Sequence, residues 1–79
     1  MYIYKRTQIH AQPLVSETVA TFSDDQWTEA LNRIRNDLPY RWTDLVSLSV
    51  LPRHHHVSAL LNNGVLLELE SDYDEEDDE

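Results

Sequence analysis

The chain has 79 residues, 41% of them hydrophobic, which suits one small folded domain and argues against disorder throughout. It has no cysteine, which excludes disulfides and thiolate metal sites, and no run approaches the roughly 20 apolar residues of a membrane helix. The net charge of −9 argues against direct binding to nucleic acid or anionic lipid. We therefore expect a soluble, cytoplasmic protein, and a chain this small leaves a homodimer open as a source of stability.

Two strands are predicted in the first 22 residues. They run from about Tyr2 to His10 and from Leu14 to Thr21, and they are separated near Gln12-Pro13. Tyr2 and Tyr4 alternate with other residues along the first strand. We expect them either on an exposed sheet face or at an edge used for dimerization.

A helix is predicted after Phe22. Ser23 is a good N-cap, Gln26 stands three residues later as in a capping box, and Phe22 with Trp27 fits a hydrophobic staple. Pro39 should end the helix near Asn36 or Asp37. One apolar stripe follows helical spacing and should face the core: Trp27, Ala30, Leu31, Ile34 and Leu38.

A loop with two large aromatic residues and a strand come next. Tyr40 and Trp42 flank Arg41, and these residue types dominate interface hot spots. Trp42 is therefore either part of an exposed recognition patch or the side chain that closes one end of the core. The strand spans 45–51 and ends at Pro52.

The last two strands are predicted to form a hairpin around Asn62-Asn63-Gly64. A three-residue loop with Gly64 in the left-handed region sets Leu61 against Val65, Ala59 against Leu67, and Val57 against Leu69 on one apolar face. The other face then receives these pairs: Leu60 with Leu66, Ser58 with Glu68, and His56 with Glu70.

The order strand, strand, helix, strand, strand, strand indicates an α+β fold. We expect an antiparallel sheet of about five strands with one helix packed on one face. The helix residues Trp27, Leu31 and Ile34 should meet the apolar face of the hairpin and one face of the 45–51 strand. Residues 1–70 form the single domain, and residues 71–79 form an acidic C-terminal tail.

Three adjacent histidines, His54-His55-His56, invite a metal interpretation. In an extended segment at most two of the three converge, so His10 or a tail carboxylate would have to complete the site. The alternative is cross-strand pairing of His56 with Glu70 and of His54 with Asp72, which should tighten this end of the hairpin on acidification. We favour the pairing and expect no bound metal or other cofactor.

Charge is distributed very unequally along the chain. Residues 1–67 carry six acidic and six basic residues and have no net charge, so the whole charge of −9 belongs to the last twelve positions. These acidic residues are Glu68, Glu70, Asp72, Asp74, Glu75, Glu76, Asp77, Asp78 and Glu79. An extended tail would carry a charge roughly every 4 Å, close to the ~3.4 Å spacing of phosphates along a DNA strand. Such a run either mimics a nucleic-acid backbone or keeps the protein soluble.

In size, charge, lack of cysteine and expected α+β build, the chain resembles small acidic inhibitors of phages and mobile elements, the anti-CRISPR and anti-restriction DNA mimics. The resemblance is one of general character, and the run from Glu68 to Glu79 is the feature that carries it. It implies binding to a basic nucleic-acid-binding protein or complex, such as a CRISPR effector.

The sequence offers little for catalysis. His56 and Glu70 could serve as an acid–base pair, but there is one glycine, no cysteine and no Gly-rich phosphate loop. We expect a non-catalytic binding protein. The alternative to a DNA mimic is a small accessory or regulatory protein, antitoxin-like or a structural subunit, that binds through Tyr40, Trp42 or a sheet edge.

Overall fold

A computed structural model describes residues 1–71 of the chain. Its strands are β1 (Tyr2–Gln8), β2 (Val15–Phe22), β3 (Leu45–Leu51), β4 (His56–Leu61) and β5 (Val65–Ser71), and its helix is α1 (Trp27–Asn36). Short 3₁₀ helices, Trp42–Asp44 and Pro52–His54, lie on either side of β3. The predicted order of elements is confirmed, and the first two strands differ from prediction only at their ends.

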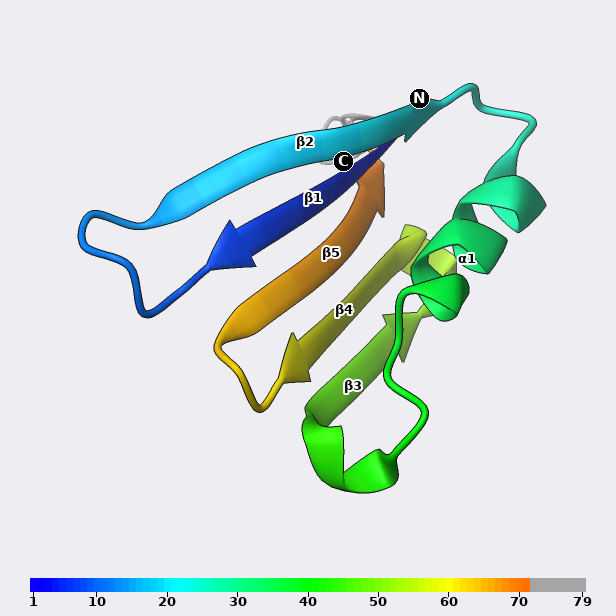
Figure 1. The fold of residues 1–79 in the computed structure, drawn as a ribbon. Coiled ribbons are helices and arrows are strands. Elements are labelled where there is room, and N and C mark those ends of the chain that lie inside the picture. The colour runs from blue at the N-terminus through cyan, green and yellow to red at the C-terminus, as the bar shows by residue number, and fades with distance from the viewer. Residues whose placement is uncertain (72–79) are drawn as a thin grey trace.

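The five strands form one antiparallel sheet in the order β2-β1-β5-β4-β3. Figure 1 shows this order, with α1 on one face of the sheet. The predicted α+β fold is therefore confirmed. The C-terminal strand β5 lies at the centre, with hydrogen-bonded neighbours on both sides, and β2 and β3 are the edges.

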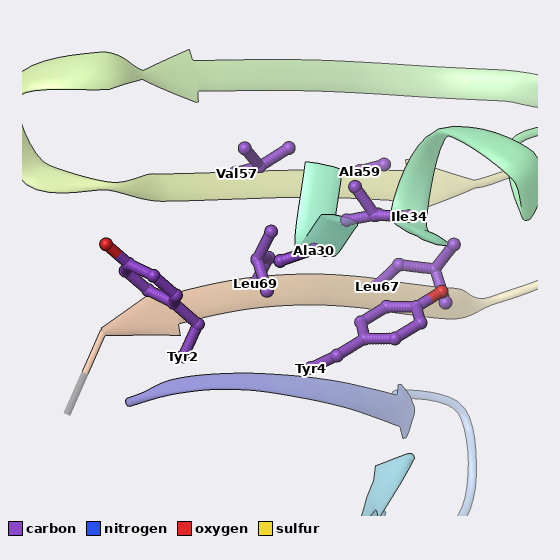
Figure 2. Close-up of a cluster of buried hydrophobic side chains, with 8 residues drawn as sticks. All are labelled: Tyr2, Tyr4, Ala30, Ile34, Val57, Ala59, Leu67 and Leu69. Atoms are coloured by element: carbon purple, nitrogen blue, oxygen red, sulfur yellow. The ribbon is translucent and has the colours of Figure 1, made fainter. Parts of the chain in front are cut away.

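The core lies between α1 and the central strands. Ala30 and Ile34 of α1 meet side chains from β1, β4 and β5, as Figure 2 shows. The eight buried residues are Tyr2, Tyr4, Ala30, Ile34, Val57, Ala59, Leu67 and Leu69. Burial of this apolar area, at roughly 25 cal/mol per Å², is the main stabilising contribution for so small a domain.

The predicted register of the β4–β5 hairpin is confirmed. Ala59 pairs with Leu67 and Val57 with Leu69 on the helix face, while Ser58 pairs with Glu68 on the outer face. Gly64 has a φ of +87°, a conformation that a side chain with a Cβ rarely adopts. The three-residue loop with a left-handed glycine therefore fixes which face of each strand is buried.

The start of α1 differs from the predicted capping box. The helix begins at Trp27, and no side chain caps its first amides. Gln26 Oε1 does accept a hydrogen bond from the backbone N–H of Ser23 at 3.0 Å, which is half of the box. The Ser23 hydroxyl instead donates to Asp25 Oδ1 at 2.7 Å, so it closes a turn before the helix. The predicted end is confirmed, since the last helical residue is Asn36.

Neither interpretation of Tyr2 and Tyr4 is correct. They are 7% and 1% exposed, because β1 lies inside the sheet between β2 and β5 and turns both rings toward α1. The ring of Tyr2 packs against Trp27, with 5.0 Å between centroids. The alternation of Tyr2 and Tyr4 with other residues does not reveal whether β1 is an edge strand, because the order of strands depends on contacts between residues distant in sequence.

Candidate partner-binding surfaces

The acidic run begins on the central strand of the sheet. Glu68 and Glu70 lie on the outer face of β5, opposite the helix, because Leu67 and Leu69, which alternate with them along the strand, are buried in the core. Both glutamates are half-buried among neighbouring strands. Because β1 and β4 hold β5 from both sides, the beginning of the acidic run is rigidly placed.

A lysine of the adjacent strand neutralises part of this charge. Lys5 Nζ lies 2.8 Å from Glu70 Oε2, and Lys5 stands opposite Glu68 in the β1–β5 register. The hydrogen bond to Glu70 and the charges of both glutamates raise the pKa of Lys5 above its ordinary value. The ammonium therefore stays charged at neutral pH and compensates one carboxylate of the outer face. The remaining acidic positions, from Asp72 to Glu79, lie outside the described residues.

The three histidines do not converge. His54 ends a 3₁₀ helix, and His55 has a φ of 51°, so the segment is not extended, which was the condition for two of the imidazoles to point the same way. The His55 ring packs against Trp27 at 4.9 Å and against Tyr2 at 5.6 Å between centroids. His55 is therefore part of the packing at one end of α1. The predicted partner of His54, Asp72, lies outside the described residues.

His56 lies beside the acidic residues of β5. One ligand atom from each of His56, Glu68 and Glu70 can be chosen so that all three lie within 4.8 Å of one another. The Nδ1 atom of His56 is buried and has no hydrogen-bond partner among the described residues, while Glu70 binds Lys5. This is the set that could ligate a divalent cation, and it contains a glutamate that the sequence interpretation omitted. Lys5 would have to move aside for a metal.

His10 cannot complete that set. Its imidazole lies beside Gly64, at the hairpin loop, because a Cβ on Gly64 would come within 2.6 Å of His10 Nδ1. His56 begins β4 and so lies at the opposite end of this hairpin. The proposed ligand from the N-terminal segment is therefore wrong.

The aromatic loop before β3 is exposed. Tyr40 is 104% and Trp42 80% exposed, so the interpretation that the Trp42 side chain closes one end of the core is wrong. Core space is instead filled by α1, with Leu38 and Leu45 packed at its edge. Asn62 holds the loop in place, since its Nδ2 donates to the carbonyl of Thr43 at 3.3 Å.

Trp42 and the C-terminal end of β5 lie at opposite ends of the sheet. β3 and β5 run in the same direction, because both are antiparallel to β4. Trp42 precedes the first residue of β3, whereas Ser71 is the last residue of β5. Seven strand residues span about 20 Å, so a small pocket on a partner cannot hold both Trp42 and the C-terminal end of β5. Figure 1 shows this separation between the C-terminal end of β5 and the loop before β3.

An apolar groove between α1 and β3 was not predicted. The sequence interpretation placed one face of the 45–51 strand under the helix, but α1 packs over β1, β2 and β5. Leu48 and Val50 are consequently 43% and 50% exposed. They line a groove of about 320 Å³ together with Leu31 and Leu38. Alternation of apolar residues with serine identified the strand, but it could not show how far the short helix reaches across the sheet.

Comparisons with protein-family models, with curated proteins and with solved structures found no match for this chain. No helix among residues 1–71 is long and apolar enough to cross a membrane.

Proposed function

We propose that this chain is a non-catalytic binding protein that uses its acidic C-terminal run to occupy a basic, nucleic-acid-binding site on a partner, as an inhibitor of the anti-CRISPR or anti-restriction kind does by mimicking DNA. The observation that carries the proposal is the placement of the charge. All nine net negative charges arise within Glu68–Glu79, and that run starts on the strand at the centre of the sheet.

The position of β5 favours binding energetically. A charged segment that leaves a strand fixed by two neighbours loses less freedom on binding than one at the end of a flexible linker. Extended on a partner, this run would carry carboxylates at nearly the spacing of phosphates along a DNA strand. A groove lined with Lys and Arg for a nucleic-acid backbone would attract it, and salt would weaken the attraction.

The test removes or neutralises the tail, and the truncation takes from the folded body only Ser71, the last residue of β5. Immobilised chains 1–79 and 1–70 are compared for capture of proteins from a host lysate, and captured proteins are eluted with duplex DNA and with increasing salt. We expect the intact chain to retain a basic nucleic-acid-binding protein that DNA displaces, and the truncated chain to lose it. A full-length variant with Asn and Gln at the seven acidic positions of 72–79 should also lose it.

A matched control exchanges Asp for Glu and Glu for Asp at the same seven positions, which keeps charge and length. This variant should bind as the intact chain does, because charge spacing and not side-chain shape carries the recognition. Equal capture by the intact and the truncated chains would overturn the proposal.

A second candidate function rests on the exposure of Trp42. A tryptophan that is 80% exposed beside a fully exposed Tyr40 is typical of an interface hot spot. In this alternative the chain is an accessory or regulatory protein and the tail serves solubility. A Tyr40→Ala, Trp42→Ala double variant would then lose the partner while the chain 1–70 keeps it, the reverse of the result expected for a DNA mimic.

A further inference from the structure

The edge strand β3 lacks most of the features that usually protect an edge from pairing with another chain. An edge strand presents alternate backbone N–H and C=O groups without partners, and proteins commonly cover it or place charges, prolines or bulges along it. β3 contains no charged residue and no proline. Four of its side chains are largely exposed apolar groups: Val46 at 59%, Leu48 at 43%, Val50 at 50% and Leu51 at 46%.

The opposite edge is protected in the usual way. β2 carries Glu17, which forms an ion pair with Arg6 of β1, and the β1–β2 ladder contains a register shift beside Lys5. In β3 the register shift lies at its beginning, between Leu45 and Ser47. The rest of β3 is regular and open for pairing.

The sequence of β3 reads the same in both directions: Leu45-Val46-Ser47-Leu48-Ser49-Val50-Leu51. We propose that β3 pairs with β3 of a second copy, antiparallel and centred on Leu48, so that two five-stranded sheets join into one sheet of ten strands. A two-fold axis through Leu48 sets Leu48 opposite its own copy, Ser47 opposite Ser49 and Val46 opposite Val50. Each side chain then meets one of its own kind, as an isologous interface requires.

The side-chain faces agree with this pairing. Leu48 and Val50 lie on the helix face, because their partners Ala59 and Val57 are in the core. Residues directly opposite each other across an antiparallel pair project to the same face. The apolar residues of both copies would therefore cover the groove between α1 and β3 on each side of the axis, while Ser47 and Ser49 meet on the outer face.

The charge distribution selects the antiparallel arrangement. Ser71 and Leu51 lie at the same end of the sheet, because β5 and β3 run in the same direction. In an antiparallel dimer the C-terminal ends of the two β5 strands lie at opposite ends of the joined sheet, farther apart than the Debye length of about 8 Å at physiological salt. A parallel pairing would bring both of these strand ends to the same end of the sheet.

Pairing through β3 also gives a closed assembly. Each copy uses its one open edge, and the edges left outside are the two protected β2 strands. The proposal does not depend on the function of the acidic tail, since it concerns the opposite side of the sheet from β1 and β2.

Single cysteines test the register, because the chain has none of its own. Across the two-fold axis the Cα atoms at position 48 would be about 4.5–5.5 Å apart, within the range that a disulfide spans. Leu48→Cys should therefore form a covalent dimer on mild oxidation. Val50→Cys is the matched control, because its own copy would lie about 13 Å away along the strand. Neither Val46→Cys nor Val50→Cys should cross-link alone, but a mixture of the two should.

Sedimentation of the intact chain tests the dimer without substitution. The expected mass is twice the 9.3 kDa of the chain. Leu48→Lys brings two ammonium groups together at the axis and should weaken dimerization at least tenfold, whereas Val15→Lys, which adds the same charge at the exposed β2 edge, should not. Circular dichroism melts confirm that each variant is folded.

Three results would overturn the proposal. One is a chain that sediments as a monomer at its highest soluble concentration. Another is equal cross-linking of Val50→Cys and Leu48→Cys, which would show random collision. The third is a monomeric chain whose capture of a different protein is abolished by Leu48→Lys, which would assign the edge to a strand of that protein.

Discussion

The hydroxyl of Tyr4 donates a hydrogen bond of 2.6 Å to Oδ2 of Asp37, and this bond joins β1 to the C-terminal end of α1. Tyr4 is 1% exposed, and the guanidinium of Arg33 lies over its ring, 5.7 Å from the centroid. Arg33 also approaches Asp37, with Nε 3.5 Å from Oδ2. One strand and the last turn of the helix are therefore joined at a single carboxylate, in a domain that has one α-helix among its described residues.

Tyr4→Phe should destabilise the fold by about 1 kcal/mol, the usual net contribution of one hydrogen bond. The ring and its contact with Arg33 remain, and Asp37 keeps Arg33 and partial access to water, so no isolated charge is left behind. In a domain of this size the midpoint of thermal unfolding should fall by about 4–8 °C. An unchanged midpoint would show that the hydrogen bond contributes nothing.

The same bond predicts a stability that falls at alkaline pH. Burial of the ring, then the hydrogen bond to Asp37 and its charge, raise the pKa of Tyr4 above its ordinary value of 10.0. The unfolded chain therefore loses this proton first, and the stabilisation is complete below pH 10 and declines as pH rises above it. Denaturant titrations should show the stability difference between wild type and Tyr4→Phe shrinking above pH 10. A difference that stays constant would exclude linkage to Tyr4.

The core should tolerate little loss of volume, because it has few members. Leu69 lies on the central strand and is fully buried. Leu69→Ala should cost about 2–5 kcal/mol, since it removes apolar contacts and leaves a cavity under α1. Small domains are stable by only about 5 kcal/mol or slightly more, so a melt of this variant should begin far below that of the wild type. Leu14→Ala, at a leucine that is 62% exposed, is the control and should change stability by less than about 0.5 kcal/mol.

Local signals in the sequence predicted the helix and the hairpin correctly. Gly64 in a three-residue loop, with alternating residues on both sides, was enough to fix the pairing of Val57 with Leu69. The end of α1 before Pro39 was predictable because the proline constrains the residue before it. Both signals act over a few residues, which is why sequence alone can read them.

Features that depend on distant contacts were not predictable. Tyr2 and Tyr4 are buried because β5 pairs with β1, and Tyr4 lies 65 positions before its cross-strand partner Leu69.

 No local sequence pattern can link two residues so far apart along the chain. Trp42 is exposed for a related reason, since its place depends on how far α1 extends across the sheet. The side chains of Leu48 and Val50 on the helix face of β3 are exposed because the short helix α1 does not extend across them.

The candidate site was predicted in composition but not in arrangement. The acidic positions could be read directly, and so could the exposed aromatic candidates Tyr40 and Trp42. The sequence could not show that Lys5 binds Glu70, because that contact joins the two ends of the chain. Nor could it show that Glu68 joins His56 and Glu70 in one group, since side chains on one face meet only once strand order is known.

The hairpin loop should be sensitive to a side chain at Gly64. Its φ of +87° is strained for any residue with a Cβ, and that Cβ would lie 2.6 Å from Nδ1 of His10. Gly64→Ala should therefore destabilise the fold by at least about 1 kcal/mol. His10 is an exposed side chain that can rotate away, so the backbone strain should account for most of the loss.

A double variant separates the two causes. His10→Ala alone should have little effect, and adding it to Gly64→Ala should recover only the part of the loss that comes from the clash. Chemical denaturation of the four chains gives this coupling as a double-mutant cycle. Full recovery in the double variant would mean that the contact with His10, and not the backbone conformation, determines the cost.

Lys5 offers a test of whether the outer face of β5 belongs to the binding surface. Lys5→Gln removes the ammonium that compensates Glu70 and changes the net charge from −9 to −10. Because the ion pair is partly exposed to solvent, stability should change by less than about 1 kcal/mol. If a basic partner contacts Glu68 and Glu70 as well as the tail, its affinity should rise and should fall more steeply with salt.

Arg6→Gln is the matched control for this prediction. It makes the same change in net charge on the neighbouring residue, but the Arg6 guanidinium pairs with Glu17 of β2, and its partner across β5 is the buried Leu67, not an acidic residue. Affinities of both variants for the partner captured by the intact chain are measured by calorimetry at two salt concentrations. A gain for Lys5→Gln alone supports contact with the strand, because only this variant frees a carboxylate of β5. Equal gains in affinity for both variants would mean that the partner responds to the overall charge of the chain. The binding surface would then be confined to the residues after Glu70.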